Sequence, residues 1–459
     1  MVHYLRIYGL LIIAFHLASP WLDVEHAWGA GGFAFLPGPV RIGVAAVAVL
    51  SLSPLAGAAW RQVEGLGRRL LRIQDRLAGS PGSRLRLRVC AAVMFFPLFW
   101  VARLQHLRWG DAYIFAHAIS HPEVRLTYNW QSPLDLFLHA KLWSLLNAAW
   151  GWDVEHTYAL ISCLAGVAYV YLLLESLPYW GETSSEKATA LTFFLTLGSL
   201  QLFFGYVESY TILPVGILGF LVLGLRFLSG NGALWPAAAV LAFTHSLSLS
   251  TLPLLLALAY LVWHGYRARG LSPERLALEA GGPMLVMALL VLSIMTAGGH
   301  GIQALLTHDF PGGGDASWFV PLFRTETRWQ HYTMFSWAHL RDILNQQILV
   351  APFGLATVTG VLVLRRRSVR WKEPWFRFLI LAAGAYLLLT FVWNPDYGGR
   401  RDWDLFAPAS FPLTALAVYL VNRYLEPRER EQATVLIAAV SLMHLGPWIH
   451  FNAQPWPWD

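Results

Sequence analysis

The sequence predicts an all-α polytopic membrane protein with about 13 transmembrane helices, a cytoplasmic N-terminus and an extracytoplasmic C-terminus. Of its 459 residues, 56% are hydrophobic and only 13% are charged, a balance far too apolar for an ordinary soluble domain. Apolar runs of about 18 residues or more recur along the chain, and each is long enough to cross a bilayer core. Many of the 22 tryptophans lie near the ends of these runs, where indole rings favour the headgroup layer. A multi-pass membrane protein satisfies all three observations.

The apolar runs set the order of the predicted elements. The first run has the length of a signal peptide, but we interpret it as a retained first span. Cys90 and Cys163 both fall inside apolar runs, so no disulfide framework is expected. The predicted spans lie near residues 5–20, 39–58, 88–106, 155–177, 187–205, 210–229, 232–248, 250–266, 281–297, 346–364, 376–394, 405–422 and 434–450.

The distribution of arginine orients these spans. Residues 61–88 contain eight arginines against two acidic residues, and an excess of arginine in a short loop marks the cytoplasmic side of a membrane. Part of this segment has helical apolar spacing and is expected to lie on the inner surface as an amphipathic helix. The basic clusters at 267–275, 365–372 and 423–430 fall on the same side. The net charge of +6 therefore reflects short inner loops and does not predict nucleic-acid binding.

Residues 133–149 form an apolar segment that does not fit the alternation of spans. The segment is short and contains Asp135, His139 and Lys141. A full span here would reverse every later loop and place the arginine clusters outside, against the positive-inside rule. We therefore expect a juxtamembrane or re-entrant helix within a first large outer loop at 107–154. A second large outer loop is expected at 298–345.

Acidic residues and histidines collect on the predicted outer face. Asp111 lies in the first outer loop just past an apolar run, where a carboxylate needs water, a partner or a function. Aspartate is also a favoured helix N-cap, which gives Asp111 an ordinary structural interpretation. Glu208 and His245 lie in turns so short that both side chains are expected close to membrane depth, where ionisable residues are candidates for function. In a helical bundle these outer segments can converge on one cleft.

The densest polar segment is 394–404. Gly398 and Gly399 let backbone N–H groups approach an anion closely. Arg400 and Arg401 supply forked donors that suit phosphate. This segment is therefore the strongest candidate for phosphate binding in the chain.

Asp402 and Asp404 have a D-x-D spacing with two interpretations. As hard oxygen ligands they suit a divalent cation, magnesium or manganese. Alternatively they form an internal salt-bridge network with the two arginines before them, and we favour this slightly because D-x-D alone is a weak signal. Asp309 precedes a stretch rich in proline and glycine, which predicts a mobile loop and a candidate lid. The histidines of that loop have no spacing typical of a zinc site.

These features resemble the GT-C superfamily of membrane glycosyltransferases, in a type A-like layout, which use polyprenyl-phosphate-linked sugars. The resemblance covers residues 88–422. Residues 1–87 add two N-terminal spans and the basic cytoplasmic segment, and residues 423–459 hold the last span and an outer tail. Two short motifs carry the resemblance, each with one residue of the family pattern lost: Gly110-Asp111-Ala112-Tyr113 is similar to the acidic motif of the first outer loop, and Gln131-Ser132-Pro133-Leu134 to the Pro-Pro-Leu-like element that opens a second surface helix.

The resemblance implies transfer of a sugar from a polyprenyl-phosphate donor to an acceptor hydroxyl at the extracytoplasmic face by direct displacement. Asp111 matches the position of the catalytic base, and Glu208 is the second catalytic candidate. Arg400 and Arg401 are the pair available to stabilise the leaving phosphate. Further candidates for substrate or phosphate contact are Tyr113, His245 and Asp309.

The expected partners are the lipid-linked sugar, membrane lipids, and an acceptor that is a glycan, a lipid or a protein. No nucleotide fold is expected, because the chain has no glycine-rich dinucleotide motif and no P-loop. The expected location is the plasma (inner) membrane, with the site facing the periplasm or cell exterior.

Two other functions stay open. A multispan transporter or flippase for lipid-linked substrates would suit so many spans. Transporters normally place ionisable residues near the bilayer midplane, however, whereas here they gather at one face. A non-catalytic subunit of an envelope complex would suit a first-loop motif that retains a single acid, Asp111.

Overall fold

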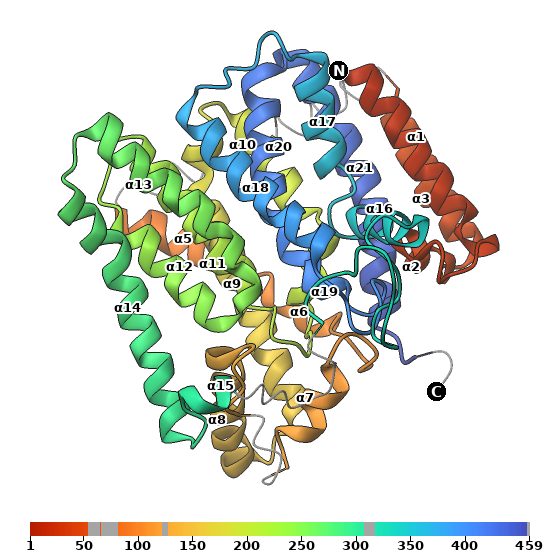
Figure 1. Cartoon of the computed structure of the whole chain (residues 1–459). Coiled ribbons are helices and arrows are strands. Elements are labelled where there is room, and N and C mark those ends of the chain that lie inside the picture. The colour runs from red at the N-terminus through yellow and green to blue at the C-terminus, as the bar shows by residue number, and fades with distance from the viewer. Residues whose placement is uncertain (54–64, 66–80, 122–126, 307–316, 457–459) are drawn as a thin grey trace.

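The computed structural model describes residues 1–53, 65, 81–121, 127–306 and 317–456, and this part of the chain is built from helices (Figure 1). Its one described β pairing is an isolated antiparallel bridge between Phe319 and Trp393. The predicted all-α class is confirmed. The α-helices are α1 (Val2–Ala18), α2 (Gly31–Ala34), α3 (Gly38–Ser51), α5 (Pro81–Val93), α6 (Phe96–Val101), α7 (Ala112–Ala118), α8 (Pro133–Trp150), α9 (Val154–Trp180), α10 (Ser184–Leu195), α11 (Leu213–Leu228), α12 (Trp235–Leu247), α13 (Leu255–Arg269), α14 (Pro273–Ala297), α15 (Ile302–Leu306), α16 (Trp337–Val350), α17 (Gly354–Leu364), α18 (Pro374–Val392), α19 (Trp403–Phe406), α20 (Ser410–Tyr424) and α21 (Pro427–Asn452).

Within the described residues, seven helices are long and apolar enough to cross a membrane, or eight if the bent pair α16–α17 is one span. Every predicted span overlaps a helix, but several of these helices are short or broken, so the number 13 is not confirmed. Proline accounts for two breaks. Pro97 lies at the start of α6, just after the gap that follows α5, and Pro352 lies at the 101° bend between α16 and α17. Proline lacks an amide N–H and disfavours helical geometry in the residue before it.

The bundle is centred on α20, whereas α14 lies at its edge (Figure 1). In the apolar segment that contains α20, 94% of residues are buried, against 11% in α14. Small residues allow close approach between neighbouring helices, as at Gly224 of α11, where an added Cβ would collide with the ring of Phe378 in α18. The largely exposed sides of α14 have the character of a lipid-facing helix.

The two predicted N-terminal spans correspond to α1, which is long enough to cross a membrane, and to the shorter apolar helix α3. Helices α1, α2 and α3 all pack against α21. The backbones come close at Gly32, where a Cβ would lie 3.1 Å from the Cα of Trp448. The division of the chain at residues 87 and 422 stays a prediction.

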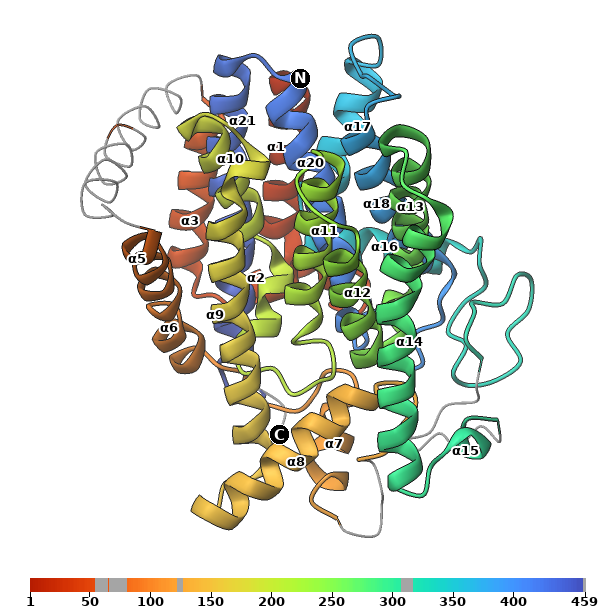
Figure 2. The same ribbon diagram turned by 90° about the vertical axis from the view of Figure 1, so that its left-hand side faces the viewer.

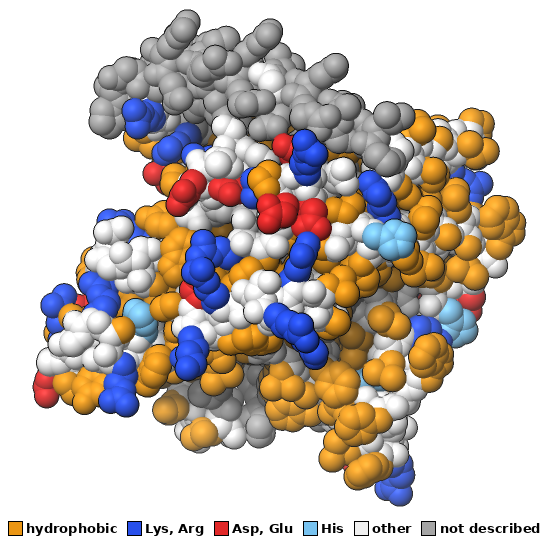
Figure 3. All heavy atoms as spheres, turned by 90° about the horizontal axis from the view of Figure 1, so that it is seen from above, with side chains coloured by type: hydrophobic (Ala, Val, Ile, Leu, Met, Phe, Trp, Pro, Cys, Tyr) orange, Lys and Arg blue, Asp and Glu red, His pale blue; other side chains and the backbone are white. Residues whose placement is uncertain are grey.

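One end of the bundle carries the arginine-rich loops (Figure 3). Arg365, just after α17, donates to both carboxylate oxygens of Glu429 in α21, each at 2.8 Å. Arg430 donates to Glu186 in the first turn of α10 at 3.2 Å. The N-terminal ammonium of Met1 lies 4.0 Å from Glu429. These contacts bring the starts of α1, α10 and α21 and the end of α17 to the same end of the molecule.

The opposite end carries the loop that the sequence predicts to be the first outer loop. Helix α21 runs from one end to the other, and its last residue, Asn452, accepts a hydrogen bond from Trp109 Nε1 at 2.7 Å. Here α8 lies obliquely across the bundle instead of along it (Figure 2), as expected of a juxtamembrane helix, and it is not among the candidate spans. The predicted amphipathic helix after residue 60 and the loop around Asp309 lie outside the described residues.

Candidate functional site

Three segments that are distant in sequence meet at the end of the bundle that carries the first outer loop. They are residues 109–111, the turn at 206–210 and the turn at 397–404. The backbone N–H of Asp111 donates to Oε1 of Glu208. The N–H of Gly110 donates to the carbonyl oxygen of Arg401 at 2.9 Å. The first outer loop is thus joined by hydrogen bonds to both of the other segments.

Gly110 marks the closest approach of the first loop to two carboxylates. Its φ is +49°, a left-handed conformation that favours glycine. A Cβ at this position would lie 2.5 Å from Oε1 of Glu208 and 2.8 Å from Oδ2 of Asp404. The same Oδ2 accepts a hydrogen bond from the Tyr206 hydroxyl at 3.2 Å. Both carboxylates therefore face the backbone that carries Asp111, and only glycine leaves them room.

Glu208 is held by the turn that precedes α11. Its side chain is 2% exposed, and its second oxygen, Oε2, accepts the N–H of Ser209 at 3.0 Å. The Ser132 hydroxyl donates to the Ser209 hydroxyl at 3.2 Å, which attaches the start of α8 to the same turn. One buried carboxylate therefore binds backbone groups from two segments and fixes the position of the Asp111 backbone.

Asp111 is the most accessible carboxylate of this group. It occupies the N-cap position of α7, but its side chain makes no capping hydrogen bond. The hydroxyl of Tyr397 donates to its carboxylate instead. Asp111 is half-buried, whereas Glu208 and Asp404 are buried. The capping interpretation therefore accounts for the position of Asp111 but not for the contacts of its side chain.

Asp402 and Asp404 use their oxygens differently within the 397–404 turn. The N–H of Tyr397 donates to Oδ2 of Asp402 at 2.7 Å. The N–H of Leu405 donates to Oδ1 of Asp404 at 3.0 Å. In the part of the chain that the structure describes, no group of three or more His, Cys, Asp or Glu side chains is arranged to hold a metal ion. The proposed magnesium or manganese site at this D-x-D pair gains no support from the geometry.

The two arginines of this turn have different surroundings. No ion pair joins either of them to an aspartate of the same turn among the described contacts, so the predicted internal network is not found. Arg400 is half-buried and paired with Glu25 from the N-terminal segment. Arg401 is exposed, and its guanidinium carbon lies 5.0 Å from the ring centre of Tyr397, the residue that binds Asp111. Of these two arginines, Arg401 is the one that forms no ion pair within the described part of the chain, and its charge acts on Asp111.

The surroundings raise the pKa values of the clustered carboxyls. For Asp111, burial raises the pKa, and the hydrogen bond from Tyr397 and the charge of Arg401 offset part of that rise. For Glu208, burial raises the pKa well above the ordinary value, and the charges of Asp404 and Asp111 raise it further. Like charges this close disfavour simultaneous ionisation. The cluster therefore retains a proton under conditions that ionise an isolated carboxyl.

A second ionisable pair lies behind the site, between α8 and α9. Asp135 and His139 are fully buried, with 3.1 Å between Oδ2 and Nδ1. The His139 ring stacks on Tyr158 with 3.9 Å between ring centres. Burial raises the pKa of Asp135, and the neighbouring imidazole lowers it in part. From the sequence, we used these two residues in interpreting segment 133–149 as a juxtamembrane helix and did not assign them to a site.

Three other predicted residues do not join the cluster in the described contacts. Tyr113 is exposed, and its ring stacks on His117 with 4.1 Å between centres. His245 is buried near the end of α12, where its Nδ1 lies 2.7 Å from the Thr251 hydroxyl. Asp309 lies outside the described residues. Their predicted contacts with substrate stay predictions.

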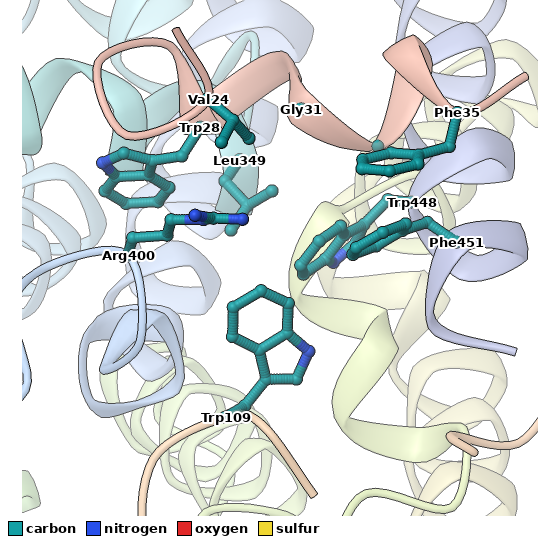
Figure 4. Close-up of a pocket in the computed structure, with 10 residues that line it drawn as sticks. Val24, Trp28, Gly31, Phe35, Trp109, Leu349, Arg400, Trp448 and Phe451 are labelled. Atoms are coloured by element: carbon teal, nitrogen blue, oxygen red, sulfur yellow. The ribbon is translucent and has the colours of Figure 1, made fainter. Parts of the chain in front are cut away.

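A pocket adjoins the cluster on the side of the N-terminal segment (Figure 4). Its empty volume is about 290 Å³, including open solvent. Arg400 reaches it from the 397–404 turn and Trp109 from the first outer loop, and Trp28, Trp448 and Phe451 add aromatic walls. The pocket and the carboxylate cluster therefore lie against the same two segments of chain.

Sequence reasoning missed residues that shape this region. Tyr206 lies in the same turn as Glu208, and Tyr397 lies in the polar segment 394–404. The closeness of these tyrosines to candidate carboxylates in the sequence could have marked them as hydrogen-bond partners. Glu25 and Trp448 carried no such signal, because only the packing of the N-terminal segment on α21 brings them here.

No model of a known protein family matches the chain, and no curated protein sequence matches it. Among solved structures, the chain is similar to the crystal structure of ArnT from Cupriavidus metallidurans bound to undecaprenyl phosphate. The superposition has a TM-score of 0.52 and 11% sequence identity, and it covers 82% of this chain and 77% of that one. The chain therefore shares the overall fold of that structure over most of its length, in agreement with the fold expected from the two short motifs.

Proposed function

We propose that this protein is a membrane glycosyltransferase that moves a sugar from a polyprenyl-phosphate donor to an acceptor hydroxyl by direct displacement. The observation that carries the proposal is the cluster of Asp111, Glu208 and Asp404 beside the exposed Arg401, whose charge acts on Asp111. A likeness in fold to a protein solved with undecaprenyl phosphate supports the class of donor. The proposed location is a plasma membrane, with the cluster on the extracytoplasmic side.

Asp111 is the proposed base. Its carboxylate takes the proton of the acceptor hydroxyl as the new bond forms between that oxygen and the anomeric carbon. The bond from the anomeric carbon to the phosphate oxygen breaks, and its electron pair leaves with the lipid phosphate. A raised pKa suits this role, because a base works best with a pKa near the working pH.

Glu208 and Arg401 have different proposed roles. Glu208 is a positioning residue, because it is buried and binds the backbone N–H of Asp111. Arg401 is exposed beside the cluster and supplies positive charge to the leaving phosphate. Arg400 is already paired with Glu25, so we assign the phosphate to Arg401 alone.

The test is a transfer assay with purified protein, a radiolabelled polyprenyl-phosphate sugar and membrane extract as the source of acceptors. Wild type should transfer the label, and Asp111→Asn should stop transfer while the protein stays folded. Retained transfer in Asp111→Asn would remove this residue as the base. Movement of the lipid-linked sugar across vesicles without transfer would support the transporter instead.

A further inference from the structure

The loop of residues 317–336, which leads into α16, has an ordered inner side. Its backbone follows the end of α18, where Val320 N–H donates to Val392 O at 2.9 Å and Asn394 N–H donates to Trp318 O at 3.0 Å. The Asn394 side chain donates to Trp329 O at 3.1 Å. A small cluster of buried side chains supports these bonds from below. The loop is therefore fixed on the segment that leads to the 397–404 turn.

The outer side of this loop is apolar and exposed. Phe323 is 87% exposed, although loops of soluble proteins seldom present a phenylalanine so fully to water. Contiguous exposed apolar patches of this kind mark interaction sites. Other large apolar side chains of residues 317–337 are exposed too, namely Phe319, Leu322, Phe335 and Trp337.

Charge on the outer side is mainly positive. Arg324 is 83% exposed at its side chain and lies 3.7 Å from Glu326, the one acidic residue of the loop. Arg328 lies with its guanidinium carbon 4.6 Å from the ring centre of Trp329. Aromatic rings interleaved with arginine suit the headgroup layer of a bilayer, where rings bury their apolar bodies and guanidiniums contact phosphates.

The apolar side of the loop is continuous with the sides of two helices. The ring of Phe335 lies 6.1 Å from that of Phe391 near the end of α18. Leu388 of α18, one helical turn before Phe391, and Leu344 of α16 are exposed as well. Figure 2 shows the loop projecting sideways from the bundle, where it does not close over the end of the bundle. A surface that continues from lipid-facing helices has lipid as its natural occupant.

We infer that residues 317–337 dock on the membrane surface, with Phe323 and its neighbours in the headgroup layer and Arg324 and Arg328 against anionic lipid phosphates. The docking loop also contacts a residue next to the carboxylate cluster. The Trp329 ring packs on Tyr397 with 5.8 Å between centres, and Tyr397 binds Asp111. Docking of the loop would therefore restrain Tyr397, the tyrosine next to the cluster. The inference rests on the helical bundle and not on the proposed reaction.

The experiment measures the depth of Phe323 in the full chain. Cys90 and Cys163 are replaced by serine, and Phe323→Cys is labelled with an environment-sensitive fluorophore. The protein is placed in vesicles of phosphatidylethanolamine and phosphatidylglycerol. Two quenchers are compared, a nitroxide on the lipid chains and aqueous iodide. Leu289→Cys on the exposed side of α14 is the hydrocarbon control, and His121→Cys is the aqueous control.

The Phe323 probe should resemble the Leu289 control more than the His121 control. Its emission should be blue-shifted, quenched by the lipid nitroxide and shielded from iodide. Vesicles without phosphatidylglycerol should weaken the shift, and so should the double substitution Arg324→Gln and Arg328→Gln. Quenching by iodide as strong as at His121 would overturn the inference. Shielding from both quenchers would overturn it too, because a protein would then cover the loop.

Discussion

The two ends of the bundle differ in what happens to their charged side chains. At the arginine-rich end, Arg365 is paired with Glu429 and Arg430 with Glu186, so charge of one sign lies against charge of the other. At the opposite end, Asp111 lies beside two buried carboxylates, and like charges are brought together. Opposite charges stabilise each other, whereas clustered carboxylates destabilise each other, and such perturbed groups are typical of functional sites. The ion pairs at one end therefore have a structural role, whereas the carboxylates at the other end are candidates for a chemical role.

The largest expected effect comes from removing the accessible carboxylate. Asp111→Asn should lower the rate of sugar transfer by about 100-fold or more, the usual contribution of a general base. Its melting temperature should stay close to that of wild type, because the amide has the same shape and still accepts from Tyr397. The rate of transfer and thermal unfolding are measured on the same preparation.

The matched variant at the other end is Glu429→Gln. It should lose stability, because Glu429 accepts from Arg365 and lies 4.0 Å from the N-terminal ammonium of Met1, yet it should keep the rate of transfer. If Glu429→Gln abolished transfer while Asp111→Asn did not, the division of roles between the two ends would be reversed.

Gly110→Ala should disturb the site through shape alone. The added Cβ would lie 2.5 Å from Glu208, and the φ of +49° is strained for alanine. We expect a loss of about 1–3 kcal/mol in the free energy of unfolding together with a fall in transfer. Gly43→Ala in α3 is the control, since no atom lies within 4 Å of its added Cβ. Equal stability of the two variants in chemical denaturation would contradict the close approach at Gly110.

The neighbouring arginines Arg400 and Arg401 should differ in their effect on donor binding. Arg401→Gln should raise the KM for the lipid-linked donor about tenfold, roughly the worth of one charge-assisted hydrogen bond. Arg400→Gln should change this KM little, because its partner is Glu25. Steady-state kinetics over a range of donor concentrations distinguishes them, and the opposite ranking would assign the phosphate to the aromatic pocket.

The smallest expected effect is on stability against pH. The pKa of Glu208 is raised in the folded protein, so the folded state holds more protons than the unfolded state above the ordinary carboxyl range. Stability should therefore fall as pH rises through that window. Glu208→Gln should make this fall smaller, because burial also raises the pKa of Asp111 and Asp404, and the variant should melt a few degrees higher than wild type at neutral pH. Below the ordinary carboxyl pKa the two proteins should melt alike, and parallel curves at all pH values would contradict the raised pKa.

Much of this arrangement could be predicted from the sequence, but the breaks within helices and the long-range contacts could not. Apolar runs located the helices, and the alternation of arginine-rich loops grouped Asp111, Glu208 and the 397–404 turn at one end. The breaks at Pro97 and Pro352 were underestimated, because apolar composition continues through them. Helical breaks of this kind depend on local backbone geometry that a hydropathy window averages out.

The sequence could not predict which residues distant in the chain would form contacts with the site. The pairing of Arg400 with Glu25 depends on how the N-terminal segment packs on α21, and no local pattern encodes it. Tyr113 was grouped with Asp111 because it is close in sequence. In the structure it belongs to a helix whose side chains rotate by about 100° per residue, so it points into solvent.

The proposed function requires that the two ends of the bundle lie on opposite sides of the membrane, with the carboxylate cluster on the extracytoplasmic side. With Cys90 and Cys163 replaced by serine, Arg401→Cys and Arg366→Cys are each exposed single cysteines, one at each end. An impermeant maleimide is applied to intact cells and to permeabilised cells. We expect labelling of Arg401→Cys in intact cells and of Arg366→Cys only after permeabilisation. Labelling of both cysteines from the same side, or of Arg366→Cys alone in intact cells, would contradict an extracytoplasmic site.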